Sequence, residues 1–122
     1  MRVAIHQPLL FGYKGYFDLI GSVDKFVMYD DAKFEKKYFF NRNKFPDPFT
    51  FRMEKASDYA KCNERYFFDI EGDKKRFKKK YPKLKHKYLD PMQQSYNFSY
   101  NTYLVTKAIC GDMGINTPVY FS

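Results

Sequence analysis

The sequence predicts an α/β protein that opens with a βαβ-like unit. Residues 3–5 and 25–29 are two short apolar runs, and each is followed by polar residues, as strands are when they reach a loop. Between them, Phe17, Ile20 and Val23 share one helical face. Strand, glycine-containing loop, helix and strand within about 30 residues favour parallel pairing of the two strands.

The middle of the chain predicts further short strands and a basic helical segment. We expect strands at 38–40, 49–53 and 66–70, the last ended by Gly72, which would make the sheet mixed. Phe77, Tyr81, Leu84 and Tyr88 recur at spacings typical of one helical face. Pro82 interrupts this pattern, so two helical pieces or a kink are predicted.

The C-terminal part predicts one long helix and a last strand. The helix is expected over about 100–112, with Leu104, Ala108 and Ile109 as its buried face. Gly114 is placed to adopt the left-handed conformation that ends many helices. Residues 119–121 are expected to form the final strand.

Length and composition indicate a single globular domain over residues 1–122. Hydrophobic residues make up 44% of the chain, and the 14 Phe and 12 Tyr can fill a core with few aliphatic residues. No apolar run approaches the roughly 20 residues of a membrane span, and there is no signal-peptide pattern, so a cytoplasmic protein is expected. Cys62 and Cys110 are expected to be reduced and buried. Without Walker, GxGxxG, GxSxG or zinc-ligand spacings, no cofactor and no metal are expected.

The net charge of +8 comes from one segment. Between residues 74 and 87 there are nine basic residues and no acid, and the rest of the chain is close to neutral. These nine form a predicted basic patch: Lys74, Lys75, Arg76, Lys78, Lys79, Lys80, Lys83, Lys85 and Lys87. Such a patch suits nucleic acid or an anionic membrane surface, although a solvated helix face explains it equally well.

The first candidate site follows the first strand. His6 and Gln7 lie where the strand ends, and Tyr13 and Tyr16 open the following helix. Ligands of open α/β sheets bind beyond the carboxyl ends of strands, near helix N-termini. His6 is therefore a candidate for catalysis and the other three for substrate binding, whereas a histidine held in a turn is the structural alternative.

The second candidate site is Asp30-Asp31, at the end of the second strand. Because side chains alternate along an extended chain, the two carboxylates are expected to point in different directions. One would face the cleft as a catalytic base or a metal ligand, and the other would cap a turn. A purely structural pair of turn acids is equally compatible with the sequence.

The third candidate is Asn41-Arg42-Asn43. A guanidinium can hold a phosphate or carboxylate through two parallel hydrogen bonds, and the flanking carboxamides add donors and acceptors. The trio suits recognition of a sugar or nucleotide, or a buried polar brace for the two aspartates.

Together these landmarks resemble the WbqC-like proteins of bacterial surface-polysaccharide gene clusters. The resemblance is strongest over residues 2–45 and rests on Val3-Ala4-Ile5-His6-Gln7-Pro8, Gly15-Tyr16-Phe17, Tyr29-Asp30-Asp31, Lys36 and Asn41-Arg42-Asn43. It implies that Lys36 and the Asn-Arg-Asn trio contribute to substrate binding. Members of this family are typically longer, so the chain is expected to lack their C-terminal half.

The resemblance also implies a function in O-antigen-type polysaccharide biosynthesis. A transferase that attaches an amino-acid or acyl group to a nucleotide-linked amino sugar is the expectation it carries. The histidine-containing loop before a Gly-Tyr helix start is, in addition, similar to nucleotidyltransferase-like folds, as an analogy of fold only. The alternative is a non-enzymatic module, bacterial or phage-encoded, that binds nucleic acid through residues 74–87.

Overall fold

The computed structural model describes residues 1–34, 49–83 and 86–121, and it confirms the α/β class. Three parallel strands form a sheet in the order β1 (Val3–His6), β2 (Lys25–Met28) and β3 (Val119–Phe121). Helix α1 (Lys14–Gly21) connects β1 to β2, and helix α3 (Phe98–Asp112) precedes β3. Helix α2 (Ile70–Lys80) and the 3₁₀ helices η2 (Cys62–Glu64) and η3 (His86–Leu89) lie in the long connection between β2 and α3.

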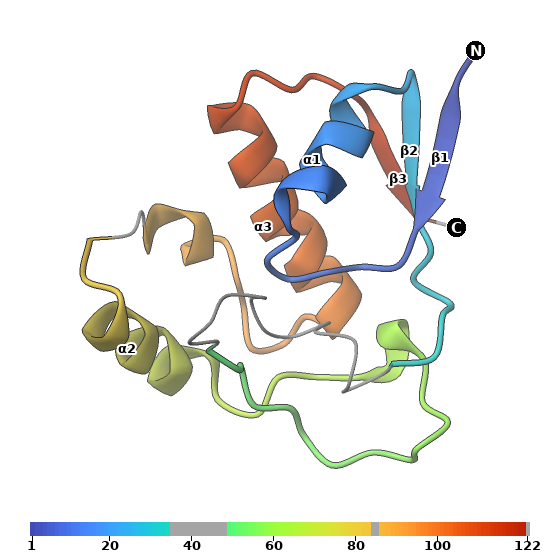
Figure 1. The fold of residues 1–122 in the computed structure, drawn as a ribbon. Helices are drawn as coiled ribbons and strands as arrows, with labels where there is room; N and C mark the ends of the chain where they lie inside the picture. Colours follow the sequence, from blue (N-terminus) through green and yellow to red (C-terminus); the bar gives the residue numbers. More distant parts are fainter. Residues whose placement is uncertain (35–48, 84–85, 122) are drawn as a thin grey trace.

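Both α1 and α3 lie on the same side of the sheet (Figure 1). The connection from β1 through α1 leads to the neighbouring strand β2. The connection from β2 through α3 leads one strand further in the same direction, to β3. Crossovers of one hand that step in one direction place their helices on one face. The predicted βαβ unit is therefore confirmed, and β3 extends it.

The opposite face of the sheet is open in the part of the chain that is described. Val3 is 51% exposed and Ile5 is 64% exposed, although both lie in β1. An apolar run such as residues 3–5 is typical of a buried strand, but these two side chains are exposed because no described layer covers this face of the sheet. Ala4 and Phe26, which are register partners, point to the helical side, where Phe26 is fully buried.

The expected mixed sheet is not found among the described residues, where all three strands run parallel. The segments 49–53 and 66–70 are not strands and are joined by one antiparallel bridge between Met53 and Phe67. Phe51 and Phe67 are instead fully buried, so the alternating pattern reflects insertion of single rings into the core. Asp69 ends the second segment by accepting a hydrogen bond from Gly72 N (3.0 Å), and α2 begins at Ile70. The strand predicted at 38–40 lies outside the described residues.

The basic segment forms two helical pieces, as predicted, with Pro82 between α2 and η3. The long helix α3 and the strand β3 are also confirmed, and Gly114 has a positive φ of 72°. The predicted buried face of α3 was wrong, because Leu104, Ala108 and Ile109 are only half-buried. The buried face carries mainly polar residues: Ser99, Asn101, Thr102, Val105, Thr106 and Cys110.

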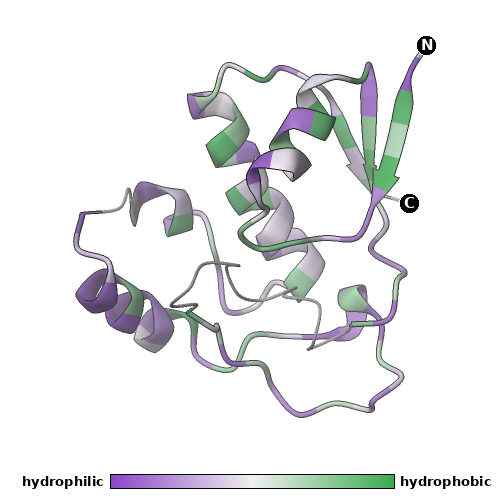
Figure 2. Cartoon of the chain, in the orientation of Figure 1, coloured by the Kyte–Doolittle hydropathy of each residue, from purple (hydrophilic) through white to green (hydrophobic). Residues whose placement is uncertain are grey.

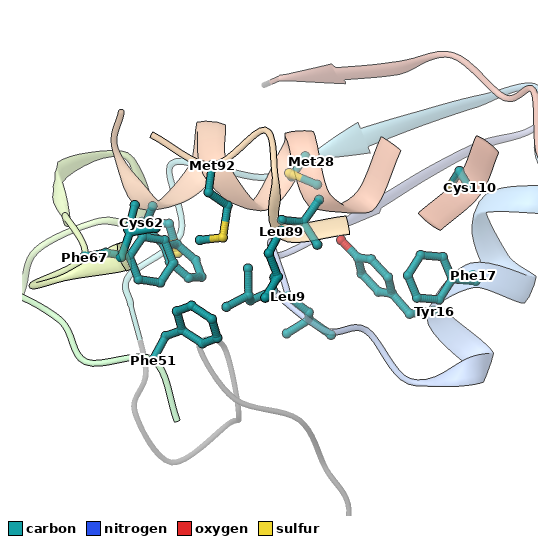
Figure 3. Close-up of a cluster of buried hydrophobic side chains, with 14 of the residues drawn as sticks. Leu9, Tyr16, Phe17, Met28, Phe51, Cys62, Phe67, Leu89, Met92 and Cys110 are labelled. Atoms are coloured by element: carbon teal, nitrogen blue, oxygen red, sulfur yellow. The ribbon is translucent and has the colours of Figure 1, made fainter. Parts of the chain in front are cut away.

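The core joins the sheet layer to the long connection. Beside α3, the rings of Phe51 and Phe67 meet Leu9 and Leu89 (Figure 3). Tyr16 and Phe17 extend into the core from α1. By contrast, α2 is hydrophilic along most of its surface (Figure 2) and buries Ile70, Asp73 and Phe77. Among the described helices, none has the length and apolar character that crossing a membrane requires.

Candidate functional site

A cavity of about 250 Å³ opens at the carboxyl end of the sheet. We call it the Asp30 cavity, and it is lined by Asp30, Asn97, Ser99, Tyr100 and Phe121. Asp30 follows β2, Phe121 ends β3, and the other three residues form the cap and first turn of α3. The carboxyl edge of a parallel sheet beside a helix N-terminus is the usual place for ligands in open α/β folds.

The backbone around Asp30 is fixed by hydrogen bonds to two other parts of the chain. Tyr29 N donates to His6 O (2.8 Å), which continues the β1–β2 pairing past the strand ends. Asn63 N donates to Asp30 O (3.0 Å), so η2 holds the residue from the other side. The half-buried carboxylate is therefore presented to the cavity from an anchored backbone.

The two neighbouring aspartates separate, as alternation along the chain predicted. Asp31 is not among the residues that line the cavity, and it forms an ion pair with Lys61 (Oδ1 to Nζ, 3.1 Å). Its hydrogen bond raises the pKa of the Lys61 ammonium above its usual value. This pair is about half exposed, so it contributes little to stability.

The N-terminus of α3 presents a buried polar group to the cavity. Asn97 caps the helix by accepting from Tyr100 N (2.8 Å), and Phe98 N donates to Arg65 O (2.7 Å). Ser99 directly follows Phe98 and is 1% exposed, and its hydroxyl has no hydrogen-bond partner in the part of the chain that the structure describes. A buried hydroxyl without a partner is unfavourable unless a ligand or water satisfies it, and the same holds for Thr102 and Thr106 further along α3.

Aromatic rings form one wall of the cavity. Tyr100 and Phe121 are stacked, with ring centroids 6.3 Å apart and planes inclined by 18°. Each ring is 39% exposed. An accessible aromatic surface beside a carboxylate and a hydroxyl suits a ligand with both apolar and polar faces, such as a sugar.

Cys62 lies close behind Asp30 and is a neutral thiol. Burial raises its pKa to about 12, and the negative charge of Asp30 contributes in the same direction. The expectation that Cys62 and Cys110 are free and buried is confirmed. A thiol with so high a pKa is a poor nucleophile near neutral pH.

The raised pKa of the Cys62 thiol predicts that the folded protein loses stability at alkaline pH. The folded protein disfavours the Cys62 thiolate, so the stabilisation is complete below pH 9 and is lost as the pH rises towards 12. At pH 10.5 we expect the free energy of unfolding to have dropped by about 2 kcal/mol on this account. Urea unfolding of the wild type and Cys62→Ala between pH 8 and about 10.5 measures this, since the variant should show a shallower decline. Equal declines in the two proteins would contradict the assignment.

The four residues of the predicted first site are not among those that line the Asp30 cavity, and one of them belongs to the core. Tyr16 is fully buried, and its hydroxyl donates to Gln7 O (3.2 Å). The His6 ring packs edge-on against Tyr16, with centroids 5.1 Å apart, and its Nδ1 lies 3.0 Å from Gln7 O. Tyr16 thus shapes the loop after β1 and has no surface to offer a substrate, while Tyr13 is 51% exposed.

Several predicted site residues lie outside the described residues. These are Lys36, Asn41, Arg42 and Asn43, together with Lys85 of the basic patch. The roles assigned to them stay predictions.

The basic patch is partly neutralised by neighbouring acids. Lys74 pairs with Glu71 (3.3 Å), and Lys87 pairs with Asp112 (3.1 Å). Arg76 pairs with the fully buried Asp73. Beside the helix is a second, larger hollow of about 510 Å³, lined by Phe49, Thr50, Arg76, Lys79 and Lys80.

Sequence reasoning found Asp30 but missed Asn97, Ser99, Tyr100 and Phe121. Asn97 carried a detectable signal, since Asn before a helix start is a frequent cap. The others became part of a site only through the pairing of β3 with β2. Within the described residues, no three His, Cys, Asp or Glu side chains gather closely enough to hold a metal ion.

The structure is that of an α/β protein with a cavity at the carboxyl edge of a parallel sheet. Comparison with known protein families shows to which family the chain belongs. The profile of the WbqC-like protein family matches residues 7–122, and the chain belongs to that family.

The chain is also similar to an uncharacterized protein of Mycobacterium tuberculosis, Rv1507c. The two are 46% identical over 43 residues, which is 35% of this chain and 19% of that protein. The chain thus spans about a fifth of the length of this curated relative. No solved structure matches, so the analogy with nucleotidyltransferases has no structural support.

Proposed function

We propose that the protein acts in surface-polysaccharide biosynthesis, transferring an acyl or aminoacyl group to the amine of a nucleotide-linked amino sugar. Membership of the WbqC-like family supports the biological setting. The observation that carries the chemistry is the Asp30 cavity, whose lining brings the half-buried Asp30 together with Ser99 in the first turn of α3.

The cavity offers a group for each charge that acyl transfer develops. The sugar amine attacks the carbonyl carbon of an activated acyl donor, such as a thioester, and forms a new C–N bond. The Asp30 carboxylate takes the proton that the amine loses. The N-terminus of α3, where Ser99 lies, stabilises the negative charge on the carbonyl oxygen. The C–S bond then breaks and the donor leaves as a thiolate.

Amine recognition by Asp30 is tested with two ligands that differ at one nitrogen. We expect calorimetry to show that UDP-glucosamine, with a free amine, binds about tenfold more tightly than UDP-N-acetylglucosamine. Asp30→Asn should abolish this preference, because the amide carries no charge to pair with the ammonium form.

Asp31→Asn is the matched control for Asp30→Asn. It changes the adjacent carboxylate in the same way, but that side chain faces Lys61. The preference for the free amine should survive in this variant. Equal binding of both sugars by the wild type, or equal losses in the two variants, would refute the proposal.

A further inference from the structure

The hollow beside α2 has the composition of an anion site. Among the described residues, its lining brings together three cations and a hydroxyl, from Arg76, Lys79, Lys80 and Thr50, and includes no carboxylate. The three cationic residues recur at positions i, i+3 and i+4 of α2, so they project from one side of the helix. We call this hollow the α2 groove.

Arg76 is held in place before any ligand arrives. Its Nη1 donates to Asp73 Oδ1, and its guanidinium lies 4.9 Å from the centre of the Phe49 ring. Asp73 is fully buried and also accepts from Arg52 Nε (2.9 Å) and Arg52 N (2.8 Å). The carboxylate is therefore anchored by two parts of the chain. The Arg76 side chain remains 51% exposed, so it is held in position and is still accessible to a ligand.

Preorganisation of this kind distinguishes a binding site from a solvated helix face. A free surface arginine loses rotamer entropy when it binds a ligand, whereas one held by a buried carboxylate and an aromatic ring has already lost it. The planar guanidinium of Arg76 can donate hydrogen bonds to two oxygens of a phosphate. Lys79, about one helical turn further along, adds a positive charge.

We propose that the α2 groove binds the phosphate or diphosphate group of a small phosphorylated ligand. Arg76 and Lys79 hold the phosphate oxygens, and Thr50 donates a further hydrogen bond. The site is formed by α2 and the segment before Arg52, so it is separate from the residues that line the Asp30 cavity and does not depend on acyl transfer.

The test compares two lysines of the same helix turn. Lys78 and Lys79 are both exposed in the last turn of α2, where both complement the helix dipole, but only Lys79 lines the groove. The full-length chain and the variants Lys78→Gln and Lys79→Gln are titrated with inorganic diphosphate, with ionic strength held at about 0.15 M, and observed by ¹H–¹⁵N NMR.

We expect saturable shifts of the amides of Thr50 and residues 76–80. Lys79→Gln should weaken binding about fivefold or more, while Lys78→Gln should change it by less than about twofold. Parallel titrations with inorganic phosphate and UDP show whether the phosphate groups alone account for the affinity or a nucleoside adds to it.

Two results would overturn the proposal. If the amide shifts do not saturate with diphosphate, or if both substitutions weaken diphosphate binding equally, then α2 attracts anions only through its diffuse charge. Binding of single-stranded DNA that is weakened equally by both substitutions, without diphosphate binding, would instead assign the segment to nucleic acid. Neither result bears on the Asp30 cavity, which is tested by the preference for a free amine.

Discussion

Replacing Asp73 by Ala is expected to lower the free energy of unfolding by about 3 kcal/mol. The side chain is fully buried and accepts hydrogen bonds from Arg52 N, Arg52 Nε and Arg76 Nη1. Its removal leaves one backbone amide and two guanidiniums without this partner. The arginines are about half exposed and reach water, which keeps the cost at the lower end of values for broken buried pairs.

Asp18→Ala is the control for Asp73→Ala. Asp18 also pairs with a cation, Lys14 (2.9 Å), but on the exposed surface of α1. Its loss should cost less than about 0.5 kcal/mol. Urea unfolding followed by circular dichroism measures both variants. Similar losses would show that Asp73 does not brace Arg52 and Arg76, and would remove the basis for a preorganised α2 groove.

Replacing Phe51 by Ala is expected to cost about 3–5 kcal/mol. The ring is fully buried, and its contacts among the described residues include centroid distances of 5.9 Å to Phe11, 5.4 Å to Phe49, 5.9 Å to Phe67 and 6.2 Å to Phe77. These partners come from the loop after β1, the segment before Arg52, the segment before α2, and α2 itself. Deleting the ring leaves a cavity where these segments meet.

Two further variants keep the Phe51 prediction measurable. Phe51→Leu preserves most of the volume and should cost only about 1–1.5 kcal/mol, so it remains folded. Phe68→Ala removes a ring of the same kind that is 57% exposed, and it should cost less than about 1 kcal/mol. If urea unfolding gave Phe51→Ala and Phe68→Ala equal losses, the aromatic cluster would not be the core of this region.

The sequence allowed the elements of the sheet layer to be predicted, because their signals are local. The apolar runs of β1 and β2, the helical face of Phe17 and Ile20, and the position of Gly114 each depend on a few neighbouring residues. The family was recognisable for a similar reason, since its landmarks are short and regularly ordered.

The remaining errors arose where long-range packing decides the outcome. Apolar alternation around Phe51 and Phe67 is the pattern of a strand, but both rings are buried by an aromatic cluster assembled from distant segments. The buried face of α3 was misjudged because Asn101 lies fully inside it. Its carboxamide accepts from Gln93 N (2.9 Å) and donates to Gln93 O (3.0 Å) and Tyr96 O (3.1 Å), which removes the cost of burying it.

Only part of the candidate site could be predicted from the sequence. Asp30 could be identified because it follows a recognisable strand. Ser99 and Phe121 could not, because only the pairing of β3 with β2 brings the end of the chain beside Asp30. The hydroxyl of Ser99 gives no sequence signal of being buried without a partner.

The central claim is that Asp30 receives the amine of the substrate. A crystal structure of the full chain with UDP-glucosamine tests it most directly. The account predicts the amine nitrogen within about 3 Å of an Asp30 carboxylate oxygen, with the sugar against Tyr100 and Phe121. An ordered sugar whose amine lies elsewhere, with the Asp30 cavity unoccupied, would contradict it.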